Sequence, residues 1–331
     1  MPLVRIARTT IVAVISTTII ATTGAHAAQP AKGTYPERPI RLIIAQAPGG
    51  NADIIARALA EAMGERLGQT IVADNRPGAS GIIATELAVK APPDGHTLLL
   101  VPSSFGVNPA ARRNLPYDQL RDLAPITLVA MAPNVLVVGP ALPIKSVADL
   151  VNAAKANPGK LTYGSSGNLG SPHLAGELFE LMTQTDMVHV PYKGAAAAMI
   201  DLVAGRISLS FASLPSAIAH IRSGRLQALA VTTEKRFPLM PDLPTVSESG
   251  LPGFETSAWQ GLVAPARTPP AIIKRLNSEA VSVIKQPAMH ERMVQNGAAP
   301  VGSTPEELWD FARKQIEKWG KVIKAAGITP N

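Results

Sequence analysis

The spacing of hydrophobic and polar residues changes from a strand pattern to a helical pattern at a glycine-rich turn early in the chain. Residues 40–45 form an apolar run of strand length, residues 46–51 form the turn, and apolar residues then recur at helical spacing from Ile54 onward. The pattern predicts a strand, a tight turn and a helix whose first backbone N–H groups lack intrahelical partners. Because glycine lets a ligand approach the backbone and a helix N-terminus favours an anion, this turn is a candidate carboxylate site. The alternative interpretation is an ordinary turn in which Asn51 or Asp53 caps the helix.

Two further strands follow with the same alternation of strand, turn and helix. Residues 70–73 and 97–101 have the apolar composition of buried strands, and residues 82–90 have the spacing of a helix between them. This β-α-β-α-β order predicts an α/β fold in which helices cover the faces of a parallel sheet. Ligands of such sheets bind beyond the carboxyl ends of the strands, which is where Gly49 and Ser104 lie.

The middle of the chain repeats the strand, turn and helix twice. Residues 161–164 and 188–191 are predicted strands, and each runs into a turn of small residues. Helices are expected over residues 171–182, with Ser171 as the cap and a proline at the first helical position, and over residues 195–203. Each turn offers backbone N–H groups and hydroxyls, which can satisfy a carboxylate without a permanent counter-charge.

The alternation is interrupted between these two parts. Two β-rich segments, residues 126–131 and 135–138, are predicted there, and we place the crossing into a second lobe near residues 130–134. A return strand over residues 258–263 and a C-terminal helical block that packs on the first lobe would make that lobe discontinuous. The helices of this block are expected over residues 269–284, 287–295 and 305–326. The predicted division is lobe 1, residues 28–131 and 260–331, and lobe 2, residues 132–259.

The first 27 residues have the features of a secretory signal peptide. Arg5 and Arg8 precede a short apolar run over residues 11–20, and Ala25-His26-Ala27 is a small-x-small cleavage pattern. The alternative is a membrane anchor, but the run is too short and too rich in threonine to span a bilayer. We therefore expect an exported, soluble protein that is cleaved after Ala27.

Composition excludes several classes of site. The 331 residues include no cysteine, so disulfides, thiolate nucleophiles and zinc–thiolate sites are excluded. Aromatic residues make up 4% of the chain and the basic residues are scattered, which argues against nucleic acid as a partner. The histidines show no metal-ligand spacing and no phosphate-binding loop is present, so neither a metal nor a cofactor is predicted. The formal net charge of +7 is compatible with an anionic small ligand.

A serine hydrolase is the competing functional class. The sequence Gly164-Ser165-Ser166-Gly167 differs from the nucleophile turn G-x-S-x-G because its last position is occupied by Asn168. Ser165 or Ser166 would be the nucleophile, but the nearest histidines in the sequence have no recognisable partner pattern around them. We therefore expect no enzyme, and an exported serine hydrolase stays as the alternative.

Eight short motifs lie in order along nearly the whole mature chain. They are YPERPI (35–40), APGG (47–50), NRPGASG (75–81), YGSSG (163–167), VPYKG (190–194), ALAVT (228–232), PDLPTV (241–246) and APARTP (264–269). Through these motifs the chain resembles the Bug-type solute receptors, the extracytoplasmic binding proteins of tripartite tricarboxylate transporters.

The resemblance implies the two-lobe periplasmic binding protein type II fold, with a hinge between the lobes and a ligand held between them. It implies a periplasmic, non-catalytic receptor that binds a small carboxylate and delivers it to the permease subunits of a membrane transporter. We also expect the receptor to be a monomer. A receptor that signals to a membrane sensor is a further alternative.

The candidate ligand-binding residues come from the turns described above and from the loops that the resemblance implicates. They are Gln46, Gly49, Gly50, Asn51, Asp53, Ser104, Ser165, Ser166, Gly167, Tyr192, Gly194 and Ala195. Two positions depart from the family pattern. Gln46 replaces a residue that is commonly aromatic, which would widen the pocket or add a polar contact. His96 replaces the tyrosine of an Asp-Gly-Tyr motif, which we interpret as a surface or packing change.

Overall fold

The computed structural model describes residues 35–49 and 51–328, which belong to one compact unit. The predicted signal peptide, residues 1–27, lies outside the described residues, as does Gly50. The strands form one sheet in the order β2 (Ile71–Asn75), β1 (Ile40–Ile44), β3 (Thr97–Pro102), β9 (Ser257–Pro265), β4 (Leu123–Val138), β7 (Leu209–Ser213), β5 (Thr162–Ser165) and β6 (Val188–Pro191). Two further strands, β8 (Gln227–Val231) and β10 (Ala299–Pro300), both pair with β4. Within residues 35–49 and 51–328, no helix combines the length and the apolar character that crossing a bilayer requires.

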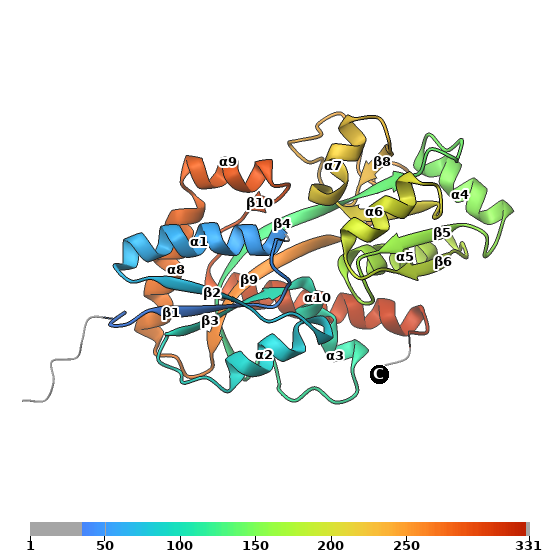
Figure 1. Ribbon diagram of the computed structural model, residues 1–331. Coiled ribbons are helices and arrows are strands. Elements are labelled where there is room, and N and C mark those ends of the chain that lie inside the picture. The colour runs from blue at the N-terminus through green and yellow to red at the C-terminus, as the bar shows by residue number, and fades with distance from the viewer. Residues whose placement is uncertain (1–34, 50, 329–331) are drawn as a thin grey trace, which may run out of the picture. The chain divides into compact units, whose positions relative to one another are not determined.

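The predicted strand and helix units form the first part of the sheet. Its parallel strands are β2 (Ile71–Asn75), β1 (Ile40–Ile44) and β3 (Thr97–Pro102). Leu42 and Leu98 face a core that includes helices α1 (Asn51–Leu67) and α8 (Pro270–Ile284). Ile43 and Leu99 face the other core, with α2 (Ile82–Val89). Since side chains alternate along a strand, helices on both faces explain why these strands are apolar throughout (Figure 1).

One long strand, β4 (Leu123–Val138), joins the two parts of the sheet. It pairs antiparallel with β9 (Ser257–Pro265) as far as Pro133↔Ser257, and from Asn134↔Ser213 onward it pairs with β7 (Leu209–Ser213). It also pairs there with β8 (Gln227–Val231). The prediction of two separate strands is wrong, because β4 does not end at Pro133 but changes its partner there from β9 to β7.

The second part of the sheet is built from parallel strands in the order β7-β5-β6. Strands β5 (Thr162–Ser165) and β6 (Val188–Pro191) are followed by helices α5 (Ser171–Thr183) and α6 (Ala195–Val203). Helix α5 packs on one face with α4 (Val147–Ala156), and α6 packs on the other with α7 (Leu214–Arg222) (Figure 1).

The C-terminal helices agree closely with their predicted ranges. After α8 come α9 (Pro287–Gln295), the short strand β10 (Ala299–Pro300) and α10 (Pro305–Ala325). Thr304 and Glu307 form a capping box at the start of α10. Leu308 of α10 packs in a core with β3 and β9, whereas Trp319 packs in a core with α5 and β7. A single helix therefore contacts both parts of the sheet.

Candidate ligand-binding site

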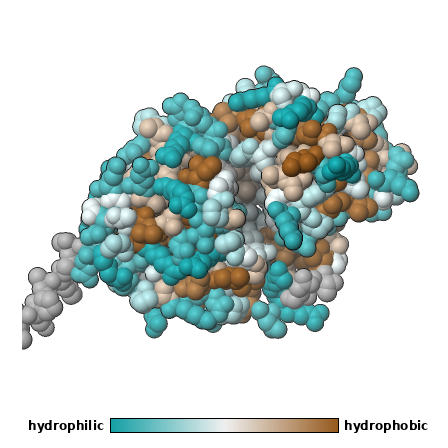
Figure 2. All heavy atoms as spheres, viewed as in Figure 1, coloured by the Kyte–Doolittle hydropathy of each residue, from teal (hydrophilic) through white to brown (hydrophobic). Residues whose placement is uncertain are grey.

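A cavity of about 580 Å³ lies at the carboxyl ends of the parallel strands. Three loop segments line it, residues 78–81, 102–104 and 166–172, and Gln46 adds a side chain from the β1–α1 turn. The floor comes from the crossing strands β4 and β9, through Ala132 and other residues. The surface is hollowed between the elements around β1–β3 and those around β5 and β6 (Figure 2).

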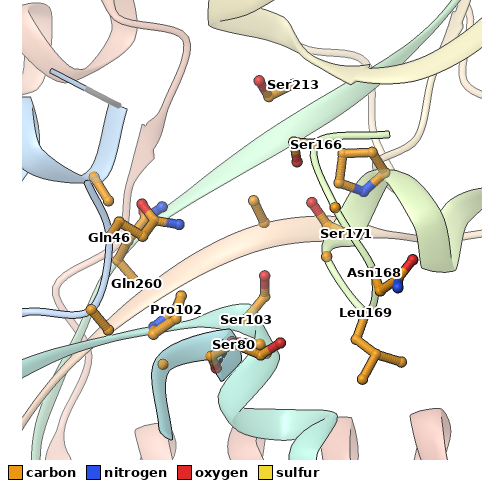
Figure 3. Close-up of a pocket in the computed structure, with 18 of the residues that line it drawn as sticks. Gln46, Ser80, Pro102, Ser103, Ser166, Asn168, Leu169, Ser171, Ser213 and Gln260 are labelled. Atoms are coloured by element: carbon orange, nitrogen blue, oxygen red, sulfur yellow. Dashed lines mark hydrogen bonds between the residues drawn. The ribbon is translucent and has the colours of Figure 1, made fainter. Parts of the chain in front are cut away.

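The polar lining of the cavity is uncharged. No Lys, Arg, Asp or Glu is among the described residues that line it. Hydroxyl and amide side chains supply the polar groups: Ser80, Ser103, Ser104, Ser166, Ser171, Ser213, Asn168, Gln46 and Gln260 (Figure 3). Ser104 and Ser171 donate their hydroxyls to other protein oxygens. The remaining side-chain donors and the backbone N–H groups of the loops can donate hydrogen bonds to an anion, but the described lining offers no cation to pair with it.

The N-terminus of helix α5 lies at this cavity and has no side-chain cap. Its N-cap is Gly170, and no side chain accepts a hydrogen bond there. The prediction that Ser171 caps the helix is wrong, because Ser171 is already its first residue and donates its hydroxyl to Asn134 Oδ1 at 3.2 Å. The first-turn N–H groups of this 13-residue helix, together with the helix dipole, therefore favour a bound anion at the cavity.

Two histidines lie behind the loop that precedes α5. Leu169 has a positive φ of 61° and donates its N–H to His173 Nδ1 at 3.1 Å. His173 Nε2 therefore carries the proton, and it lies 3.1 Å from Glu177 Oε1. The His189 ring stacks on that of His173, with ring centroids 3.9 Å apart. Burial lowers the pKa of His189 to about 4, so His189 is neutral at pH 7.

Ser165 has a supporting position in this loop. Its hydroxyl donates to Gly167 O at 3.0 Å and lies 2.6 Å from His189 Nε2. The sequence shows no partner for His189. The parallel pairing of β5 with β6 brings Ser165 next to it. However, Ser165 is 1% exposed and is not among the residues that line the cavity, so this serine and histidine pair is not presented to a bound molecule.

The loop over residues 78–81 is held in an unusual backbone conformation. Ala79 and Ser80 have φ values of 46° and 54°, a region that residues other than glycine rarely adopt. The carbonyl of Ser80 accepts hydrogen bonds from Ser104 Oγ at 2.7 Å and Asn108 Nδ2 at 3.1 Å. These bonds fix the loop against the segment that follows β3, so Ser104 lines the cavity and also supports the neighbouring loop.

The carboxylate of Asp53 is used within the β1–α1 turn. It accepts hydrogen bonds from the Gly49 N–H at 3.0 Å, from Arg57 Nε at 3.0 Å and from Asn75 Nδ2 at 2.9 Å. Burial raises the pKa of Asp53, but the hydrogen bonds from Arg57, Gly49 and Asn75 together lower it below its ordinary value. Asp53 is the third residue of α1, and its carboxylate is held by these contacts within the turn and does not line the cavity.

The turn before α6 lies apart from the cavity lining. Tyr192 donates its hydroxyl to Asp201 Oδ2 at 2.8 Å and packs against the core between α6 and α7. Gly194 is the N-cap of α6, with a φ of 109°, and Ala195 is the first residue of that helix. Tyr192 is half-buried and does not line the cavity.

The structure brings four of the predicted residues to the cavity. Gln46, Ser104, Ser166 and Gly167 line it. Those that do not line it are Gly49, Asp53, Ser165, Tyr192, Gly194 and Ala195. Gly50 lies outside the described residues, and Asn51 is described only as the first residue of α1. No sequence pattern pointed to Ser213 or Gln260, because both come from strands, and which face of a strand meets the cavity depends on the tertiary fold.

Comparison with known proteins identifies relatives across most of the chain. The TctC family model, the tripartite tricarboxylate transporter family receptor, matches residues 55–328. Protein BugT of Bordetella pertussis is 38% identical over 310 residues, which cover 93% of this chain and 95% of BugT. The structure of R. palustris Rpa4515 with adipate is 36% identical, covers 90% of this chain and 100% of that chain, and has a TM-score of 0.83. The structure of the periplasmic binding protein BugD is 34% identical, covers 89% and 99%, and has a TM-score of 0.79.

Proposed function

Because the chain belongs to the TctC family of tripartite tricarboxylate transporter receptors, we propose that it captures a small carboxylate in the cavity and delivers it to the membrane permease of such a transporter. Its fold is the mixed α/β periplasmic binding protein fold that the sequence predicted. It is a solute-binding protein and not an enzyme.

The observation that carries the proposal is the uncapped N-terminus of α5 in an uncharged polar cavity. Backbone N–H groups at a helix start stabilise a carboxylate, and the nearby serine hydroxyls supply further donors. Adipate in the Rpa4515 structure is a ligand of this chemical class. A ligand at α5 would also contact the loops over residues 78–81 and 102–104, so its binding would favour the state in which the two lobes are closed.

A thermal-shift screen of the mature chain tests this proposal. The panel contains dicarboxylates, tricarboxylates, acidic amino acids and aromatic acids. A ligand at about 100 times its Kd stabilises the folded state by about 2.7 kcal/mol, which raises the melting temperature by several degrees. The proposal fails if no acid raises the melting temperature and mass spectrometry of the denatured protein finds no acid that was purified with it.

A substitution in the cavity tests the position of the site. Ser166 is exposed and lines the cavity, so Ser166→Trp should fill it without disturbing a core. We expect this variant to keep its melting temperature and to lose the shift with the ligand. Ser223→Trp is the matched control, because Ser223 is also exposed but lies at the end of α7. A Ser166→Trp protein that binds like the wild type would place the ligand elsewhere.

A further inference from the structure

A histidine of α5 holds the backbone of the loop that precedes this helix and lines the cavity. Residues 166–170 line the cavity, and Figure 3 shows this loop with Ser166 and Leu169 on one side of it. The N–H group of Leu169 donates to His173 Nδ1 at 3.1 Å. Side chains of a helix lean toward its N-terminus, so the His173 ring reaches back to the loop. His173 itself is 7% exposed and is not among the residues that line the cavity.

The contact with His173 supports a backbone conformation that leucine adopts at a cost. Leu169 has a φ of 61°, in the left-handed region that residues other than glycine rarely enter. Such a conformation persists only where the surrounding contacts hold it. The Leu169 side chain packs in a core with α5, and its buried N–H donates to His173. Without an acceptor this N–H would favour a different backbone path, which would move the neighbouring lining residues.

Further contacts keep the His173 ring in the form that accepts this hydrogen bond. Its Nε2 lies 3.1 Å from Glu177 Oε1, which also accepts the Tyr163 hydroxyl at 2.7 Å. Although burial raises the pKa of Glu177, the hydrogen bonds from His173 and Tyr163 hold it below its ordinary value. A carboxylate at Nε2 keeps the proton on that nitrogen and leaves Nδ1 as an acceptor. The His189 ring, which stacks on the His173 ring, restricts its rotation.

Resting on the function proposed above, we infer that His173 is a positioning residue for ligand binding. Its Nδ1 atom holds the Leu169 N–H, and through it the loop over residues 166–170, in the arrangement that receives a carboxylate. It does so without contacting the ligand, because His173 lies outside the cavity lining. Removal of this acceptor should lower the affinity for a carboxylate, because only the fraction of molecules with the correct loop conformation then binds it.

Two substitutions of the same shape separate the hydrogen bond from the bulk of the ring. Asparagine and leucine have similar branched side chains, but asparagine offers an acceptor oxygen at about the place of Nδ1. Calorimetric titration uses adipate first and then the panel acid with the largest thermal shift. We expect His173→Leu to bind at least about tenfold more weakly than the wild type, and His173→Asn to bind within about threefold of it. His96→Leu is the control, because it also removes a buried histidine but one outside the cavity lining.

Equal weakening in both His173 variants would overturn the inference, because the void and not the lost acceptor would then be the cause. An unchanged affinity in His173→Leu, with only a lower free energy of unfolding, would also overturn it. Nitrogen NMR of the histidine rings in the wild type does not depend on the variants folding. It should show a neutral His173 ring with its proton on Nε2, and a proton on Nδ1 would contradict the inference. Failure of every carboxylate to bind the wild type would instead reject the proposed function.

Discussion

Hydroxyl groups around the cavity hold its loops in shape as well as lining it. Ser104 donates to the backbone of the loop over residues 78–81, and Ser171 donates to Asn134 beneath the cavity. Ser165 ties its own loop together through Gly167. Because these bonds join protein groups to one another, they restrict the loops, and less conformational entropy is lost when a ligand binds.

At the residue scale, Gly176 is a position where one methyl group should destabilise the fold. A Cβ atom added to this glycine of α5 would lie 2.3 Å from Cε2 of Tyr163. Tyr163 is fully buried and its hydroxyl donates to Glu177 Oε1 at 2.7 Å, so the ring cannot move away easily. We expect Gly176→Ala to lower the free energy of unfolding by about 1–3 kcal/mol, measured by urea denaturation.

Gly320 is the matched control for this prediction. It lies inside α10, and an added Cβ would be 3.9 Å from Ala110 Cβ, an ordinary contact distance. Gly320→Ala should raise the free energy of unfolding by about 0.5–1 kcal/mol, because alanine loses less backbone entropy in a helix. If both variants behave alike, the packing of Gly176 against Tyr163 is not the cause.

At the element scale, the end of α5 carries a carboxyl group whose protonation should stabilise the fold. Glu180 Oε1 accepts a hydrogen bond from the Met187 N–H at 2.5 Å. Burial raises the pKa of Glu180 from its ordinary 4.5 to about 7, and the charges of Glu177 and Asp186 add to the effect. Because the folded state holds this proton more tightly than the unfolded state, its stabilisation is complete below pH 4.5 and is lost as the pH rises through 7.

Glu180→Gln should therefore stabilise the protein more at pH 8 than at pH 5. Glutamine keeps the carbonyl acceptor for Met187 and removes the buried charge. The gain in free energy of unfolding at pH 8 relative to pH 5 should be about 1–3 kcal/mol, measured by denaturant titration at both values. Glu65→Gln, which removes an exposed charge from α1, is the control. An equal effect of Glu180→Gln at both pH values would contradict the assignment.

Local pattern predicted most of the elements, because each strand and helix unit carries its own periodicity and turn residues. Pattern alone could not show that β4 is continuous, since Pro133 ends a strand in most contexts and here lies where the strand changes partner. Helix α7 was not predicted, because its nine residues follow β7 without a turn between them. His96 was left open between a surface and a packing role, and it is buried against Tyr35.

The site was predictable as a set of loops but only partly as a set of residues. Small residues after each strand indicated which loops meet at the sheet edge, and Ser166 and Gln46 follow from that reasoning. The contact between Ser165 and His189 depends on the pairing of β5 with β6, which no sequence spacing shows. Gln260 could not be predicted either, because the sequence does not show that this position of an apolar strand faces a cavity.

At the scale of the whole molecule, the crossing strands and α10 connect the two parts of the sheet. We propose that the lobes divide where β4 changes partner, next to the predicted boundary between residues 131 and 132. Ala132 and Ala258 line the cavity at this crossing and leave room for a ligand above the strands. A carboxylate placed there would contact loops of both lobes at once, so its affinity would depend on both.

Hydrogen exchange of the backbone amides, measured with and without the carboxylate that most raises the melting temperature, tests this account most directly. We expect slower exchange in two segments together, residues 78–81 with 103–106 on one side and residues 166–171 on the other. Ser166→Trp should abolish the protection on both sides. Protection confined to one side, or a raised melting temperature with protection elsewhere in the chain, would contradict a carboxylate held between these loops.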